Sequence, residues 1–224
     1  TLSNKGFEVA ANLKLLNFKK LQWEVGLTAG HYKNQLLTLP EGDILTSVYG
    51  GTVLSRVGQS AGVFYGWKTD GVFKNQAEAD AANLSVLNIN GTYSKFAAGD
   101  VKFVDNKVDG VINDDDRQII GDPNPSIYGS FNSKLSFMKF TLNALFNYSY
   151  GNDVYNYLRS QLESGETLSN QSSVMLSRWR AEDQVTNQPK AVFGDPMGNA
   201  RFSDRWIEDG SFLRLKTVSL SYAL

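Results

Sequence analysis

The chain has 224 residues, a formal net charge of −1 and no cysteine. The balanced charge offers no basic surface for nucleic acid, and the lack of thiols excludes disulfides, thiolate metal sites and cysteine nucleophiles. Phe and Tyr are abundant, with 13 and 10 residues, yet no apolar run is long enough for a membrane-spanning helix. This composition disfavours a helical membrane protein but suits a membrane barrel, whose strands expose only alternate residues to lipid.

The first predicted elements are two strands that cover about residues 6–16 and 21–33. Apolar and polar residues alternate through both segments, which is typical of strands with one apolar and one polar face. The apolar residues are Phe7, Val9, Ala11, Leu13 and Leu15 in the first strand, and Leu21, Trp23, Val25, Leu27 and Ala29 in the second. A short polar turn at residues 17–20 joins the two strands into a hairpin.

A long connection follows, from about residue 34 to residue 125. Within it, residues 44–56 predict a small hairpin around Gly50 and Gly51, and residues 76–82 predict a short helix. Long connections with secondary structure of their own usually serve recognition or closure.

Residues 105–116 have the spacing of a calcium-binding loop. Oxygen donors occupy the first, fifth, ninth and twelfth positions, and a glycine at the sixth allows the sharp turn. The expected ligands are the side chains of Asp105, Asp109, Asn113 and Asp116 and the carbonyl of Val111. Lys107 weakens this prediction, because an ammonium group at the third position repels the ion. The alternative is a metal-free turn at Asp109 and Gly110, with Asn113 capping a brief helix.

The clearest alternation runs over two further predicted strands, residues 126–137 and 140–150, with a tight turn at Met138 and Lys139. One face carries apolar or small residues, and the other carries mostly Ser, Asn, Thr and Lys. Strands of about 11 residues are long for a soluble sheet but match a tilted crossing of a bilayer. The small polar residues suit a water-filled or plugged lumen better than a packed core.

A second long connection covers about residues 151–210, and a fifth alternating strand covers residues 211–224. Helices are predicted at residues 154–163 and 172–181. Three tryptophans of the long connections, Trp67, Trp179 and Trp206, are candidates for contact with a sugar or peptide ligand. The alternative is that they form the small cores of these connections.

The order of the connections predicts how the strands are arranged. Short turns join the first two strands and the next two, whereas long segments separate these hairpins from each other and from the last strand. Outer-membrane barrels have the same asymmetry, with short periplasmic turns and long extracellular loops. We therefore expect an all-β fold: antiparallel strands of a transmembrane β-barrel wall, with long structured extracellular loops that contain short helices. The alternative is a soluble all-β domain whose apolar faces pack on each other.

Catalysis has little support in this sequence. His31 is the only histidine, and neither a nucleophile nor an orienting acid is recognisable beside it. No glycine-rich segment has the lysine or the following helix that a nucleotide site requires. We expect no enzyme activity, and no cofactor other than calcium.

Several segments resemble the C-terminal barrel portion of SusC/RagA-type transporters, the TonB-dependent outer-membrane proteins of Bacteroidetes. These segments are residues 57–73, 99–125, 150–153, 178–179 and 204–218, and they follow the family order along nearly the whole chain. The resemblance implies a plugged barrel of about 22 strands, of which five strands are only part of the wall. It also implies the partners: a SusD-like surface lipoprotein as a lid, TonB acting through N-terminal parts outside this chain, and outer-membrane lipid. The lid is then a second candidate partner for Trp67, Trp179 and Trp206.

Together these expectations predict a segment of an outer-membrane importer that takes up glycan oligomers or peptides. The segment supplies barrel wall and extracellular loops, without covalent chemistry. The alternative function is a secreted calcium-dependent adhesin or a carbohydrate-binding β-domain. The two differ in a simple property, because the importer needs detergent and the adhesin is soluble without it.

Overall fold

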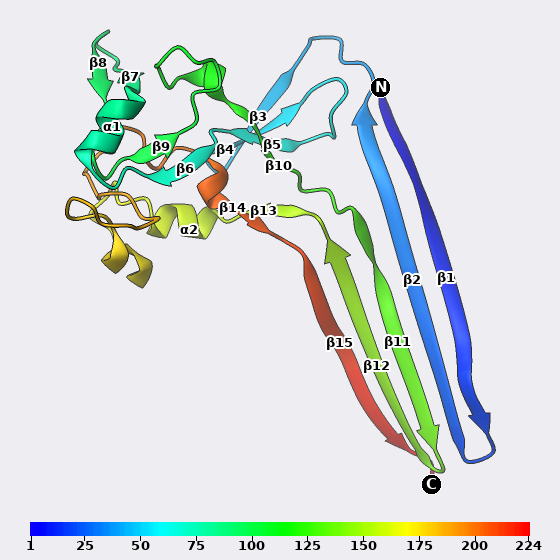
Figure 1. The fold of residues 1–224 in the computed structure, drawn as a ribbon. Helices are drawn as coiled ribbons and strands as arrows, with labels where there is room; N and C mark the ends of the chain where they lie inside the picture. Colours follow the sequence, from blue (N-terminus) through cyan, green and yellow to red (C-terminus); the bar gives the residue numbers. More distant parts are fainter.

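The computed structural model describes all 224 residues. Five long antiparallel strands form one sheet in the order β1-β2-β11-β12-β15, and the two long connections form a loop body at one end of it (Figure 1). The strands are β1 (Leu2–Phe18), β2 (Leu21–Leu36), β11 (Ile127–Phe137), β12 (Phe140–Tyr150) and β15 (Phe212–Tyr222). β11 and β12 keep their predicted bounds within one residue. β1 and β2 are longer than predicted, because they continue to pair beyond the alternating segment.

The sheet is a single layer (Figure 1). No second sheet packs on its apolar face, where Val9, Leu142 and Leu220 are 56%, 42% and 68% exposed. The hydrophobic core cluster of the chain lies in the loop body instead. The predicted barrel-wall strands and their antiparallel order are therefore confirmed, and the alternative of two sheets packed face to face is wrong.

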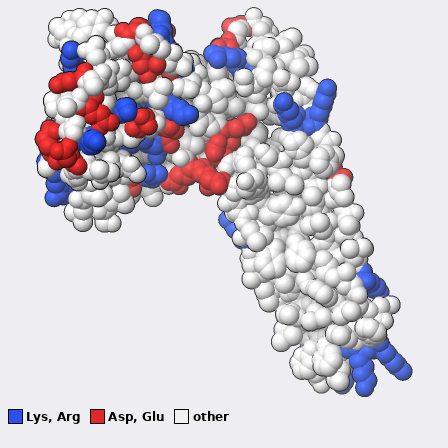
Figure 2. Space-filling view, in the orientation of Figure 1, with Lys and Arg blue, Asp and Glu red and all other residues white.

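Both short turns lie at the same end of the sheet, as predicted. They consist of residues 19–20 and 138–139, and the backbone N–H of Met138 in the second turn donates to the carbonyl of Lys20 in the first at 2.8 Å. Both long connections leave from the opposite end (Figure 1). Most of the visible sheet surface is uncharged, and Lys and Arg side chains gather at the turn end (Figure 2).

A bulge in β1 changes the alternation that the sequence suggests. Lys14 pairs with Glu24, but the next pair is Leu16 with Trp23, so Leu15 is an extra residue in its strand. Beyond the bulge it is Leu16, not Leu15, that lies opposite Trp23 of β2 and on the apolar face. An extra residue of this kind keeps one face of a sheet apolar where strict alternation in the sequence ends.

β15 contains the second bulge of the sheet. Leu215 pairs with Phe146, whereas Thr217 pairs with Leu145, so Lys216 is the extra residue. The bulge allows the apolar residues on either side of Lys216 to share one face. If Lys216 were instead paired in the regular register, Leu213 and Leu215 would point to the polar face, because a shift of one residue reverses every side chain.

Two glycines on the polar face make room for larger neighbours. The side-chain oxygens of Asn12 and Asn132 meet over Gly26, where a Cβ atom would collide with Asn132. The ring of Tyr128 covers Gly30 in the same way. Polar and aromatic side chains of adjacent strands thus lie close to the sheet rather than extending away from it.

The first long connection folds around a core of its own. Its elements are β3 (Ile44–Val48), β4 (Gly51–Ser55), β5 (Val63–Gly66), β6 (Thr69–Val72), α1 (Gln76–Ala82), β7 (Ser85–Leu87), β8 (Tyr93–Lys95), β9 (Val101–Phe103), the 3-10 helix η1 (Asp114–Asp116) and β10 (Gln118–Gly121). The buried core residues are Phe73, Ala79, Leu84, Phe96, Val101, Phe103 and Ile112. The hairpin predicted at residues 44–56 is β3–β4, and the helix predicted at residues 76–82 is α1, so both are confirmed.

The second long connection departs from its predicted helices. Its elements are β13 (Asp153–Tyr155), α2 (Tyr157–Leu162), the 3-10 helices η2 (Ser173–Ser177) and η3 (Asp204–Trp206), and β14 (Ile207–Asp209). The first part of the helix predicted at residues 154–163 is strand β13, because it pairs with β14. The helix predicted at residues 172–181 is only η2, and the N–H of Trp179 bonds to Gln188 instead of continuing it. No helix of the chain has the length and apolar composition needed to cross a membrane.

Candidate functional site

A buried polar centre holds the two long connections together. Asp100, which is 1% exposed, accepts hydrogen bonds from Asn199 (Nδ2–Oδ1, 2.9 Å) and from the ammonium of Lys190 (Nζ–Oδ2, 3.0 Å). Asn199 in turn accepts from the backbone N–H of Val101 at 2.8 Å. A buried carboxylate is tolerated only when it is paired and hydrogen-bonded. These contacts therefore fix one connection against the other.

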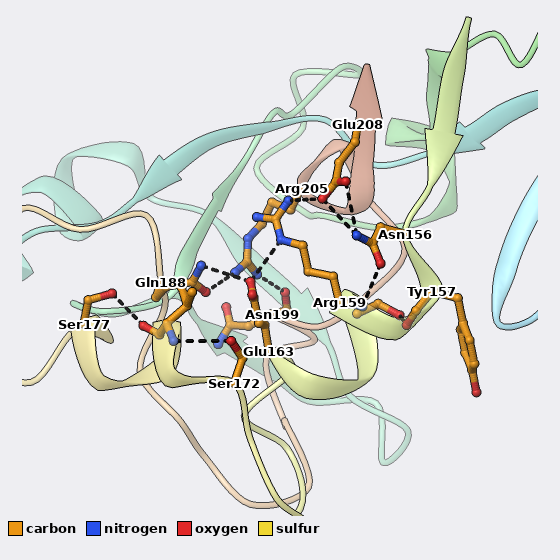
Figure 3. Close-up of polar contacts among 12 residues, drawn as sticks. Asn156, Tyr157, Arg159, Glu163, Ser172, Ser177, Gln188, Asn199, Arg205 and Glu208 are labelled. Atoms are coloured by element: carbon orange, nitrogen blue, oxygen red, sulfur yellow. Dashed lines mark hydrogen bonds and ion pairs between the residues drawn. The ribbon is translucent and has the colours of Figure 1, made fainter. Parts of the chain in front are cut away.

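A second network surrounds helix α2 (Figure 3). Arg159 donates to Glu163 (Nε–Oε2) and to Glu208 (Nη1–Oε1), each at 3.0 Å. Asn156, the N-cap of α2, accepts from the backbone of Arg159 and donates its amide to Glu208 at 3.1 Å. Hydrogen bonds from Asn156 and Arg159 lower the pKa of Glu208. The network joins α2 to strand β14.

Arg205 lies beside Arg159 (Figure 3), and it forms no ion pair with a carboxylate. It donates to the carbonyl of Asn199 at 2.9 Å and to the side-chain oxygen of Gln188 at 3.2 Å. Burial lowers the pKa of Arg205 to about 10, and the charge of Arg159 contributes to the same shift. The guanidinium carbon lies 4.7 Å from the ring centroid of Trp206, so the aromatic face replaces part of its hydration.

Trp206 is a core residue of the loop body. It is 1% exposed, and its indole N–H donates to the carbonyl of Arg201 at 3.0 Å. The side chain is thus inaccessible to a ligand or lid protein in this chain. This corrects the expectation that Trp206 contacts a ligand or lid, and it supports the alternative that Trp206 belongs to the core of its connection.

Trp67 and Trp179 are only partly buried. The ring of Trp67 lies between the guanidinium groups of Arg117 and Arg201, at 5.1 and 5.0 Å, and its N–H donates to the carbonyl of Asn113 at 2.8 Å. Trp179 packs against Gly99, which has a positive φ of 82°. Both rings contribute to the packing of the loop body, and their contact with a ligand or lid stays a prediction.

An aromatic pocket lies where the loop body meets the sheet. Its volume is about 570 Å³, and its rings are Tyr49, Phe64, Tyr155, Tyr157 and Phe202. The ring centroids of Tyr49 and Tyr157 are 5.4 Å apart, and Tyr155 meets Phe202 edge-on at 4.9 Å. The hydroxyl of Tyr155 donates to the carbonyl of Tyr49 at 3.2 Å and so links β13 to the turn of the β3–β4 hairpin.

The chemistry of this pocket suits an uncharged ligand with a flat or apolar surface. Its aromatic rings offer stacking faces, and Tyr49 is 75% exposed at the hairpin turn. The carboxylate of Asp153, which also lines the pocket, already accepts from the backbone N–H of Asp122 at 2.8 Å. Sequence reasoning missed this pocket, because its rings come from separate parts of the chain, with Tyr49 and Tyr155 106 residues apart, and only the fold brings them together.

The calcium-like loop at residues 105–116 folds as a compact turn. Asn113 caps η1 in a reciprocal capping box with Asp116, as the metal-free alternative expects. No group of three or more His, Cys, Asp or Glu side chains is placed so that it can hold one metal ion. The predicted ligands Asp105, Asp109, Val111, Asn113 and Asp116 thus share one turn, but they do not form a ligand cluster. Calcium binding stays a prediction.

Comparison with known proteins shows similarity along the whole chain. No protein-family model matches it. The chain is 30% identical to TonB-dependent receptor P3 of Formosa agariphila over its full length, and 30% identical to TonB-dependent receptor P26 of the same organism over 99% of its length. It spans 22% of the length of each of these curated relatives.

Solved structures share its fold. The RagAB peptide importer in the 'open-open' state matches 99% of this chain with a TM-score of 0.74 and 20% identity, and the chain covers 22% of that structure. The same importer in the 'closed-closed' state matches 99% of the chain with a TM-score of 0.72 and 19% identity, and the chain covers 23% of that structure. This chain is therefore homologous to TonB-dependent receptors of Bacteroidetes, and it has the fold of part of a SusC/RagA-type transporter barrel.

Proposed function

We propose that this chain forms wall and extracellular loops of an outer-membrane importer. The observation that carries the proposal is the single-layer sheet, whose apolar face is uncovered while both long connections fold into one body at its end. Lipid hydrocarbon would cover that face, and further strands of a closed barrel would pair with the free edges of β1 and β15. The loop body would then face the external medium.

For the complete importer we propose a SusD-like surface lipoprotein as a lid and TonB as the route by which energy reaches the plug. The lid is supported by the solved structures that share this fold, which are of the RagAB importer in 'open-open' and 'closed-closed' states. The substrate class is glycan oligomers or peptides. Such uptake requires binding and passage but no covalent chemistry, and the relatives are named receptors.

Within this function, the aromatic pocket is the proposed contact for the substrate. Sugar rings and apolar peptide side chains both stack on tyrosine faces, and the pocket offers such faces without a free charge. The test replaces Tyr49 and Tyr157 by alanine, singly and together, in the full-length protein. The matched control is Tyr93→Ala, because Tyr93 is 61% exposed elsewhere on the loop body.

We expect the double variant to bind substrate about tenfold more weakly, because each lost aromatic contact contributes about 0.5–1.5 kcal/mol beyond its buried area. Uptake of labelled oligosaccharides and peptides is measured in cells, and association with the lid protein is measured separately by co-purification. Unchanged uptake in the double variant would remove the pocket from the substrate path. Loss of lid association with normal substrate binding would assign the pocket to the lid instead.

A further inference from the structure

Lys107 occupies the third position of the calcium-like loop, where such loops have an oxygen donor. Its ammonium contacts two carboxylates of the same loop. The Nζ atom lies 2.5 Å from Asp115 Oδ2 and 3.8 Å from Asp109 Oδ2. A calcium loop obtains its positive charge from the bound Ca²⁺ ion, whereas here the side chain of Lys107 supplies a positive charge.

The charge of the loop explains why a cation is needed there. Residues 105–116 contain five aspartates and Lys107 as the sole basic residue. Carboxylates held close together in one turn repel each other, and a nearby cation offsets this repulsion. Arg117, directly after the loop, approaches only Asp114, at 3.7 Å. The charges of Asp114 and Asp116 also act on Arg201. Lys107 is thus the cation that pairs with Asp115 and Asp109.

The acids that would bind a metal have other hydrogen-bond partners. Asp116 is fully buried, and three backbone N–H groups donate to its carboxylate: Asn106 and Lys107 to Oδ1 at 3.0 and 3.1 Å, and Asn113 to Oδ2 at 2.8 Å. A carboxylate with both oxygens engaged in this way cannot also bind an ion through both of them without losing those bonds.

The carboxylates of the first and fifth positions also hold the backbone, although with fewer bonds. Asp105 accepts from the backbone N–H groups of Asp109 and Gly110, at 3.3 and 2.7 Å. Asp109 accepts from the backbone N–H of Val111 at 2.9 Å. The loop carboxylates are thus directed at the backbone, and no three of them converge on one point as a calcium site requires.

The loop is also part of the packing of the loop body. Ile112 is buried in the core cluster, and its N–H donates to the carbonyl of Ser85 at 2.8 Å. The carbonyl of Asn113 accepts from the indole of Trp67 at 2.8 Å. Loss of order in residues 105–116 would therefore disturb the core of the first long connection.

We propose that the ammonium of Lys107 takes the place of a bound divalent cation, so that this loop, and the body built on it, is ordered without calcium. The loop keeps the residue spacing of a calcium site, and the exposed ammonium of Lys107 offsets the charge of Asp115 and Asp109.

The test compares the full-length wild-type protein with Lys107→Asn, which restores an oxygen donor at the third position. Thermal unfolding is followed by tryptophan fluorescence in EDTA and in millimolar calcium, the range of weak extracellular sites. The wild type should have the same Tm in both solutions. K107N should have a Tm lower by about 1–2 °C in EDTA, a small shift because Lys107 and Asp115 are both exposed to water, and calcium should restore it. The control Lys102→Asn removes a neighbouring ion pair with Asp70 (2.7 Å) and should show no response to calcium.

Terbium provides a second readout that does not depend on the stability of K107N. Trp67 is hydrogen-bonded to the loop and can sensitise the luminescence of terbium bound there. The wild type should give no saturable terbium signal that calcium displaces. Such a signal, or a calcium-dependent rise in the wild-type Tm, would show that metal binds despite Lys107 and would overturn the proposal. An unchanged Tm of K107N in EDTA would also overturn it, because the ammonium would then have no role in the order of the loop.

Discussion

Two ion pairs of the loop body have similar lengths but different surroundings. Lys190 lies 3.0 Å from Asp100, which is 1% exposed, and Lys102 lies 2.7 Å from Asp70, which is 69% exposed. Water screens the second pair, so its shorter distance adds little stability. The first pair is part of the contact between the two long connections, and removal of one partner would leave buried polar groups without hydrogen bonds.

At this residue scale, Asp100→Asn should lower the free energy of unfolding by about 2–4 kcal/mol, because the ammonium of Lys190 loses its counter-ion and one of the two acceptor oxygens becomes a donor. Asp70→Asn should cost less than about 1 kcal/mol. Urea unfolding followed by tryptophan fluorescence measures both changes in the full-length protein. Equal effects of the two variants would mean that the Asp100 centre does not hold the connections together.

At the scale of elements, the bulges correct the alternation in two strands. Lys216 is the extra residue of β15, and it allows Leu213 and Leu215 to share the apolar face with Val218 and Leu220. The alternation of the sequence is broken at this point, and the fold compensates by leaving one residue outside the pairing. The same device in β1 lets Leu16 follow Leu13 on the apolar side.

Deletion of Lys216 should therefore leave the fold of β15 intact. Leu215 would then precede Thr217 directly, and Leu213 and Leu215 would keep their partners in β12 and their place on the apolar face. Deletion of Arg214 removes a paired residue instead and should lower the folded fraction, because Leu213 would move by one position to the polar face. Unheated gel electrophoresis of the full-length protein separates folded from unfolded barrel and gives the folded fraction of each variant. Poor folding of the Lys216 deletion variant would show that β15 needs the bulge itself.

At the scale of the whole molecule, the sheet and the loop body are joined mainly through the β1–β2 hairpin and the ends of β11, β12 and β15. β1 and β2 have 17 and 16 residues, against 11 in each of the other long strands. The end of this hairpin away from the short turn bonds to the loop body, since the N–H of Leu36 donates to the carbonyl of Gln59 at 2.9 Å and the N–H of Gly58 donates to the carbonyl of Leu36 at 2.8 Å. The hairpin thus continues beyond the span of the shorter strands to support the loop body.

The two faces of the sheet provide the sharpest test of the membrane position. Ala144 is on the apolar face and Asn143 is on the polar face of the same strand. Ala144→Arg should reduce the stability of the full-length protein in phospholipid vesicles by about 2–4 kcal/mol, whereas Asn143→Arg should have little effect. Urea titration of the vesicle-inserted protein gives both values. Equal tolerance of the two variants, together with solubility in the absence of detergent, would favour the secreted adhesin.

Local pattern determined much of what the sequence predicts correctly. The alternation in β11 and β12 depends only on neighbouring residues, and so does the capping of η1 by Asn113. The placement of short turns at one end and long connections at the other follows from the number of residues between alternating segments. These features are visible in one sequence because each is set within about a dozen residues.

Tertiary structure alone decided the features that depend on distant segments. The Asp100–Asn199 contact joins residues 99 positions apart, and the Tyr155–Tyr49 contact joins residues 106 positions apart. Burial of Trp206 and the conversion of residues 153–155 to a strand also require partners from elsewhere in the chain. Composition and periodicity report which face of a segment is apolar, but they do not report which other segment will cover it. The reason is that packing partners are chosen by the fold as a whole, and pairing of distant segments can override local preference.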